Sequence, residues 1–239
     1  MAEWRIGRGW SDAELEDRLE RARELPRNFS DPMDRMTVEH GWHQYYSEAV
    51  VARERPGPPE EDSPFARGQI VVANYEFSDP NIVIGHFDPH APLLGRCMLL
   101  EARAFRVLHY LGAVVVGAVR SEETEGKTVF GFRYETLEGN IERGFEWFLL
   151  TKDHATGEIS FRVEASWLPG DFPNWWSRLG FHWVAPRYQK IWHHHAHAML
   201  ARLIRNPELT GPEPEDGRLV HTGPEVEFKR FRARHVREY

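Results

Sequence analysis

Residues 129–167 read VFGFRYETLEGNIERGFEWFLLTKDHATGEISFRVEASW, and their pattern decides the fold. Apolar side chains occupy every second position in 130–134 and again in 159–167, a period that is typical of strands with one buried face. Residues 144–150 (GFEWFLL) are apolar almost throughout, as in a more deeply buried strand. Asp and Gly in 153–158 (DHATGE) suit a hairpin turn. The stretch therefore predicts three long antiparallel strands whose buried face carries aromatic rings.

One long helix is predicted after these strands, over residues 176–204, because apolar residues recur there three and four positions apart. Upstream, residues 65–79 have helical spacing. Ser11 and Glu14 have the spacing of a capping box, which predicts the start of a surface helix. Residues 27–55 fit a helix face or an irregular strand, and the pattern leaves both open.

The composition limits the classes of function. The chain has 239 residues, a net charge of −7 and one cysteine. Phosphate binding needs a basic surface, so nucleic acid is not the expected partner. One cysteine excludes an internal disulfide framework and a zinc ribbon. The sequence has neither an apolar run of membrane-spanning length nor a nucleotide-binding glycine motif, so we expect a cytoplasmic protein with no transmembrane segment and no cofactor.

Aromatic residues make up 13% of the chain and include nine Trp. Two interpretations remain open: a core rich in rings, or rings that line an apolar ligand cavity.

The run YETLEGNIERG at 134–144 resembles the signature of domain-of-unknown-function family 1990. Members typically carry His where this chain has Asn140, which weakens any role given to that His. Residues 92–101 (PLLGRCMLLE) and 117–119 (GAV) also resemble the family. The likeness covers roughly residues 65–205.

This family is similar to the helix-grip superfamily of START-like and birch-pollen-allergen-like proteins. The resemblance implies an α+β fold, in which a curved antiparallel β-sheet wraps around a long C-terminal helix and a cavity lies between them. The residue pattern independently gives a compatible picture. We predict an N-terminal extension with a surface helix and a Pro-rich loop at 1–64, a helix-grip core at 65–205 and a C-terminal tail at 206–239.

The first functional hypothesis is that a hydrophobic or amphipathic, lipid-like small molecule binds between the sheet and helix 187–205. The predicted lining residues are Phe130, Phe132, Tyr134, Trp147, Phe161, Trp167, Trp183 and Trp192. Strand parity decides which of them face inward, and a bulge at 139–144 would invert it. One alternative is a protein-interaction module that uses the aromatic N-terminal segment and the Arg-rich tail. Another is an enzyme of cyclase or hydrolase type in the same cup, for which no catalytic residue is assigned.

Two polar features bear on these alternatives. His193 and His197 are four apart on a helix, so both could reach one zinc ion, with His182 or Glu164 as a third ligand. The motif has no carboxylate of the usual zinc type, so a solvated helix face with one His on the apolar stripe is preferred and no metal is expected. Glu142 is expected to be structural, but as a general acid or base it would point into the cavity, where desolvation raises a carboxyl pKa.

Overall fold

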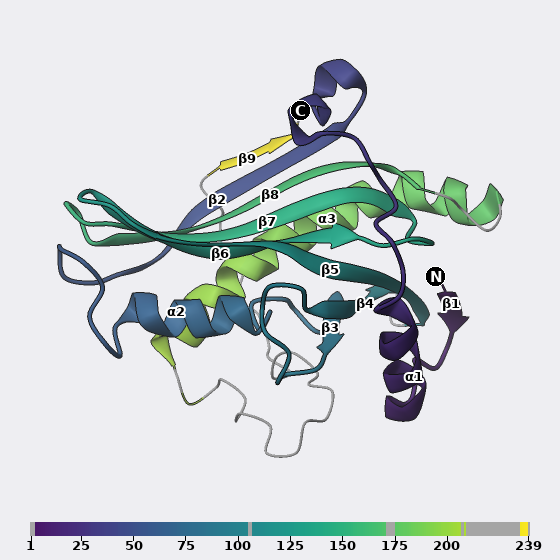
Figure 1. Ribbon diagram of the computed structural model, residues 1–239, viewed down its shortest axis with the longest axis horizontal. Coiled ribbons are helices and arrows are strands. Elements are labelled where there is room, and N and C mark those ends of the chain that lie inside the picture. The colour runs from purple at the N-terminus through teal and green to yellow at the C-terminus, as the bar shows by residue number, and fades with distance from the viewer. Residues whose placement is uncertain (1–2, 105–106, 171–174, 207, 209–234, 239) are drawn as a thin grey trace.

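Three strands form the middle of the sheet, as the sequence predicts: β6 (Lys127–Thr136), β7 (Glu142–Asp153) and β8 (Glu158–Pro169). β7 pairs antiparallel with both neighbours. The computed structural model (Figure 1) describes residues 3–104, 107–170, 175–206, 208 and 235–238, with the backbone alone described in 175–188 and 235–238.

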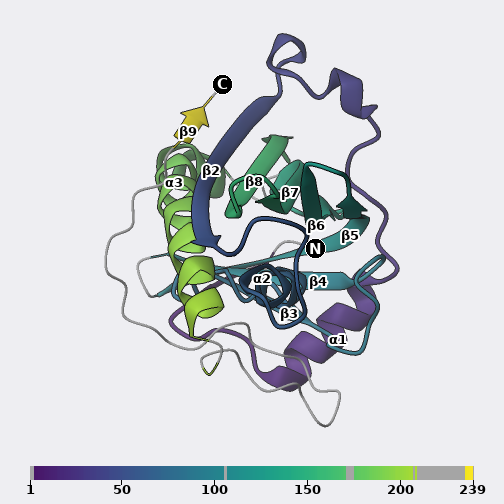
Figure 2. The same ribbon diagram turned by 90° about the vertical axis from the view of Figure 1, so that its left-hand side faces the viewer.

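The described residues form one nine-stranded sheet in the order β3-β4-β5-β6-β7-β8-β2-β9, and β1 pairs with β5. The other strands are β1 (Glu3–Ile6), β2 (His43–Arg53), β3 (Val83–Phe87), β4 (Cys97–Ala104), β5 (Leu108–Glu123) and β9 (His235–Glu238). All pairings are antiparallel. The sheet curves around helix α3 (Trp175–Arg205), which gives the predicted α+β helix-grip fold (Figure 2).

The segment that the sequence left open, 27–55, contains a strand. β2 pairs with β8 over its whole length and directs alternate side chains inward. The predicted boundary between residues 64 and 65 therefore cuts through the sheet, because a full strand of the core lies before it. The C-terminal residues 235–238 pair with β2 and extend the sheet by one more strand.

In the described part of the chain, three α-helices flank this sheet. α1 (Asp12–Ala22) begins with the predicted capping box, in which the backbone N–H of Ser11 donates to Glu14 over 2.8 Å. It packs on the convex face against β4 and β5. α2 (Pro64–Ala73) and α3 pack on each other at the concave side. Two single turns of 3₁₀-helix, Met33–Arg35 and Val38–His40, precede β2. None of the described helices is long and apolar enough to cross a membrane.

The sheet bends at Gly117. The register of β5 against β6 shifts between Val116 and Ala118, and a Cβ atom at Gly117 would lie 2.3 Å from the Cδ atom of Glu135. Gly139 occupies the turn between β6 and β7, with φ of 78°. The pairing of β7 with its neighbours is unshifted over all paired residues, so side-chain parity is preserved along that strand.

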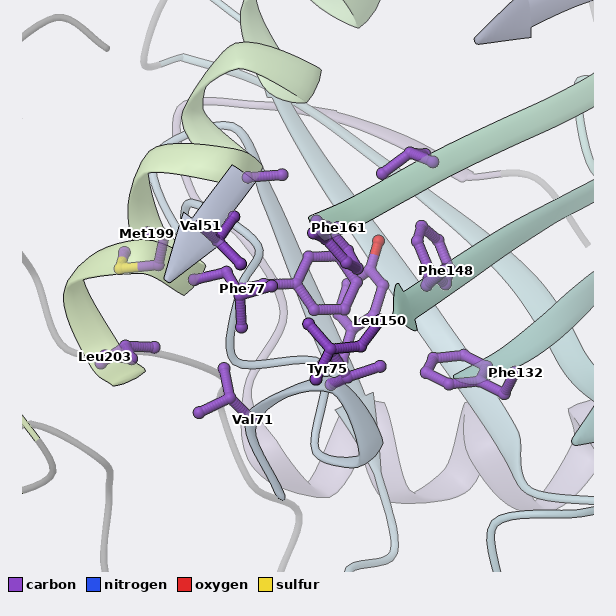
Figure 3. Packing of buried hydrophobic residues seen from close by; sticks show 14 of the residues in the cluster. Val51, Val71, Tyr75, Phe77, Phe132, Phe148, Leu150, Phe161, Met199 and Leu203 are labelled. Carbon is purple, nitrogen blue, oxygen red and sulfur yellow. The ribbon is translucent and has the colours of Figure 1, made fainter. Parts of the chain in front are cut away.

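The main hydrophobic core fills the space between the concave face, α2 and the C-terminal half of α3 (Figure 3). Phe77 and Phe148 lie at its centre, with ring centroids 4.9 Å apart. A second cluster lies on the convex face, where Leu15 and Leu19 of α1 pack against Leu99 and Leu111. Burial of both faces by separate helices fixes the sheet in place.

Candidate functional site

Four of the predicted lining residues lie in or against the main core. Phe132, Tyr134 and Phe161 reach it from β6 and β8, and Trp192 reaches it from α3. The centroids of Phe132 and Tyr134 lie 5.2 and 5.3 Å from that of Phe148. Phe132 and Phe161 expose none of their surface, so they border no space that could hold even a water molecule. The part of the cup around Phe132 and Phe161 is packed core rather than cavity, and Tyr134 lies half-buried at its edge.

Trp147 lies on the opposite face of the sheet. Its ring centroid is 5.3 Å from the guanidinium carbon of Arg133, its partner across β6 and β7 on the convex side. Even-numbered β7 residues such as Phe148 point inward instead. The apolar run 144–150 concealed this parity, because both of its faces carry rings.

The remaining predicted lining residues differ in position. Phe130 is half-buried at the edge of the main core. Trp167 is also half-buried; it stacks on His43 at 4.5 Å between ring centroids and packs against a small cluster around Tyr110. The side chain of Trp183 lies outside the described residues.

Two carboxyl groups of β7, Glu142 and Glu146, face α3. The Tyr134 hydroxyl donates a hydrogen bond to Oε2 of Glu146, and Nε2 of His193 lies 3.5 Å from Oε1 of the same carboxyl. Oε1 of Glu142 accepts a hydrogen bond of 3.2 Å from the side-chain amide of Gln189. These contacts join β6 and β7 to the face of α3 that carries Gln189 and His193.

Burial raises the pKa of both carboxyl groups. The pKa of Glu146 rises to about 8 and that of Glu142 to about 7, with the Tyr134 and Gln189 hydrogen bonds opposing the shift. Among the described side chains, no Lys or Arg forms an ion pair with either group. Carboxyl groups poised near neutral pH can both donate and accept a proton.

A buried hydroxyl links two histidines on α3. Ser47 Oγ lies 2.8 Å from Nδ1 of His193 and 2.9 Å from Nε2 of His197. The exposed fractions of the three residues are 0%, 2% and 0%. Desolvation lowers the pKa of His193 well below its usual value and that of His197 to about 4, so both rings are neutral at pH 7.

The predicted solvated face for this His cluster is therefore wrong. Residues 189, 193 and 197 face the sheet beside the apolar stripe, whereas His194 and His195 are partly exposed. The four-residue spacing of His193 and His197 was the signal that could have placed both on one helix face. Because histidine is polar, that face was assigned to solvent.

No group of three His, Cys, Asp or Glu side chains that could hold a metal ion occurs in the described part of the chain. Glu164, suggested as a third zinc ligand, alternates with the inward-facing Val163 and pairs with Arg162 on the convex side. The His182 side chain lies outside the described residues.

Asn140 holds the turn before Glu142. The sequence had marked this residue only as a departure from the family pattern. Its Oδ1 accepts hydrogen bonds from the Tyr110 hydroxyl over 2.9 Å and from the Glu142 backbone N–H over 3.1 Å. Its Nδ2 donates to the Ala113 carbonyl over 3.2 Å. The side chain thereby fixes where β7 begins and where Glu142 points.

A family described as "Domain of unknown function (DUF1990)" matches residues 30–199. The chain belongs to this family. The resemblance seen in the signature run is thus confirmed, and the DUF1990 match also includes β2, which the likeness over 65–205 had left out. No curated protein matches the chain. A solved structure titled "Crystal structure of Ara h 8.0201" is similar at 12% identity and a TM-score of 0.39, covering 69% of this chain and 99% of that one.

Proposed function

We propose that the chain binds an amphipathic small molecule against the concave face, at the end formed by Tyr134, Glu142 and Trp167. The observation that carries the proposal is a difference in exposure along this face. These three side chains keep part of their surface exposed, whereas Phe148 and Phe161 keep none. Ligand sites in proteins combine apolar walls with a few convergent polar groups, and this end of the face has both.

The chemistry of the residues suggests how such a molecule would lie. The rings of Tyr134 and Trp167 offer flat apolar surface for its hydrocarbon part. The carboxyl groups of Glu142 and Glu146 offer hydrogen bonds to a hydroxyl, carbonyl or amine at its polar end. The backbone of α3 passes over this region, so a bound molecule would be held between helix and sheet.

The test uses two Trp variants on opposite faces of the sheet. Binding of the neutral apolar dye N-phenyl-1-naphthylamine is followed by its fluorescence, and decanol is added as a competitor. Trp167→Ala is expected to weaken dye binding about tenfold, equivalent to about 1.4 kcal/mol. Trp147→Ala removes the same side chain from the convex face and is expected to leave the affinity unchanged.

Absence of dye binding by the parent protein, or equal loss in both Trp variants, would contradict the proposal. Native mass spectrometry of protein purified from its own host adds an independent measurement: a copurified amphipathic molecule that Trp167→Ala releases supports the same site.

A further inference from the structure

We propose that the buried polar chain around Glu146 is a proton-transfer site, in which Glu146 takes a proton from a bound carbon acid and returns it. In order of contact, the chain consists of Tyr134, Glu146, His193, Ser47 and His197. The inference rests on the proposed function, because the substrate is the small molecule bound at the same end of the concave face.

Glu146 lies between two groups that can donate to it. The Tyr134 hydroxyl donates to Oε2, and His193 Nε2 lies 3.5 Å from Oε1, close enough to form a hydrogen bond after a small approach. Catalytic hydrogen bonds are often long before substrate binds. Ionised Glu146 is stabilised by both donors, so this carboxyl can exist in either protonation state.

Ser47 couples the two imidazole rings, because its hydroxyl has one proton and both rings direct a nitrogen at its oxygen. If Ser47 donates to Nδ1 of His193, then His197 must donate to Ser47, and Nε2 of His193 carries a proton for Glu146. If Glu146 is protonated and donates to His193, the bonds from Glu146 to His197 all reverse, while Tyr134 still donates to Oε2. The chain therefore has two hydrogen-bond orders that correspond to the two states of Glu146.

A nucleophilic role for Ser47 does not fit this geometry. The residue is fully buried, and its oxygen lies within hydrogen-bonding distance of both rings. A hydrolase needs its serine beside an open space for the acyl group and beside donors for the oxyanion. Ser47 is thus a positioning residue that acts on Glu146 through His193.

The proposed step balances without any added reagent. The carboxylate of Glu146 removes a proton from the carbon next to a carbonyl group, the C–H bond breaks and an O–H bond forms on the carboxyl. The electron pair moves into an enolate, and the single hydroxyl proton of Tyr134 turns from Oε2 of the now neutral Glu146 to the enolate oxygen. Glu146 then returns the proton to the same or to a conjugated carbon. The substrate class is an apolar, enolisable carbonyl compound.

The pH dependence of this step is set by the groups that surround Glu146. Titratable side chains face it from the segment after α2, from β6 and α3, and from its own strand; they are Tyr75, Tyr134, His193 and Glu142. From β2, Tyr45 packs on the His193 ring at 4.0 Å between centroids. None of them carries a positive charge at neutral pH, since burial lowers the pKa of His193. Buried carboxylates in such surroundings are stronger bases than in water.

The experiment uses 5-nitrobenzisoxazole, a flat apolar carbon acid, as the probe. A base removes its ring C–H proton, the N–O bond breaks and a coloured nitrophenolate forms. Turnover is expected to rise with pH with a midpoint near the Glu146 pKa of about 8. Glu146→Gln is expected to lower it about 100-fold or more, the usual contribution of a general base. Glu164→Gln, on the convex face, is expected to leave it unchanged.

Ser47→Ala tests the positioning role. Loss of the Ser47 donor weakens the His193 donor to Glu146, so the midpoint of the pH profile is expected to rise by about 0.5 to 1 unit. Ser160→Ala, on the outward side of β8, is the matched control and keeps the parent midpoint. Nitrogen NMR of the imidazoles provides a readout without substrate: in the parent protein, raising the pH through the midpoint converts both rings together to the opposite tautomer.

The outcomes separate this inference from the proposed function. Dye binding shows whether each variant keeps the folded binding site. If dye binds normally and Glu146→Gln stays within twofold of the parent rate, or the parent is no faster than free acetate at equal concentration, the proton-transfer site is overturned while binding stands. If Glu146→Gln loses dye binding, the turnover rate of Tyr134→Phe is used to test the inference, because this variant keeps the aromatic ring. An unchanged turnover rate in Tyr134→Phe overturns the inference.

Discussion

The two ends of the concave face hold buried ionisable groups in opposite ways. At the end covered by α2, Lys152 is only 1% exposed, and it forms an ion pair with Glu54 and donates to the Pro58 carbonyl over 3.1 Å. At the other end, Glu142 and Glu146 contact tyrosine, glutamine and neutral histidine instead of a described cation. Lys152 and Glu54 neutralise each other's charge, whereas a bound proton neutralises Glu142 and Glu146.

This difference separates architecture from function. Burying a charge costs several kcal/mol unless an opposite charge or a proton compensates it. The Lys152–Glu54 pair has that compensation, and Glu54 also accepts the backbone N–H of Phe65 at the start of α2, so the pair joins two elements. Groups whose pKa values are shifted without such a structural partner are the ones expected at functional sites.

The largest expected effect comes from breaking the paired end. Lys152→Met leaves Glu54 buried without its cation and is expected to lower the free energy of unfolding by about 3–5 kcal/mol. Urea denaturation measures the loss. Lys127→Met, at the exposed start of β6, is the control and is expected to change it by less than about 0.5 kcal/mol. Adding Glu54→Gln to Lys152→Met should recover more than half of the loss; no recovery would show that the pair is not the cause.

A second effect concerns the turn that supports the polar end. Asn140→Ala removes three hydrogen bonds and leaves the buried Tyr110 hydroxyl without its acceptor, so we expect a loss of about 2–3 kcal/mol. Asn140→His introduces the side chain typical of the family signature and should lose less, since a ring nitrogen can occupy the place of the amide. Equal losses in the two variants, measured by urea denaturation, would show that shape rather than hydrogen bonding matters here.

The sequence predicted the architecture well for physical reasons that are local. Period-two alternation at 130–134 and 159–167 correctly identified two strands with one buried face, and Phe132 and Phe161 lie on that face. The same alternation failed to identify β2, where a polar side chain is buried. β2 directs the polar Ser47 inward, so its alternation was too weak to distinguish strand from helix.

The candidate site was harder to predict, because its parts come from distant segments. Ser47 and His193 are 146 residues apart in the chain, and they meet only because β2 pairs beside β8 beneath α3. The sequence contains no local signal for that pairing. Histidines on an amphipathic helix are usually solvated, and only the fold reveals that His193 and His197 are not.

The pH dependence of the free energy of unfolding should also reveal the unpaired carboxyl groups at the polar end of the concave face. The folded-state pKa of Glu146 is about 8, above its unfolded value of about 4.5, so the folded protein binds the extra proton and loses stability as pH rises between these values. The slope for one such group is about 1.4 kcal/mol per pH unit. Removing the titration with Glu146→Gln should flatten the decline of stability from pH 6.5 to 8.

Histidine titration does not obscure this result. The pKa of His197 is lowered to about 4, so its opposite contribution to stability grows between pH 4 and the unfolded pKa of about 6.5 and ends about one unit above it. The parent protein and Glu146→Gln share this contribution, which therefore cancels when their slopes are compared. Urea denaturation across pH 6.5 to 8 gives the slopes. Equal slopes for the parent protein and Glu146→Gln would show that Glu146 is already ionised in the folded state.

The smallest expected change in stability tests the hydrogen bond that distinguishes the polar end. Tyr134→Phe keeps the ring and removes the hydroxyl that donates to Glu146, at a cost of about 1 kcal/mol. The same bond lowers the carboxyl pKa, so carbon NMR of Glu146 should show a titration midpoint above the parent value of about 8. Tyr46→Phe is the matched control, because Tyr46 donates to Glu48 on the outward side of β2, where water can replace the bond. A carboxyl pKa that stays unchanged in Tyr134→Phe would show that burial alone sets the proton affinity of this site.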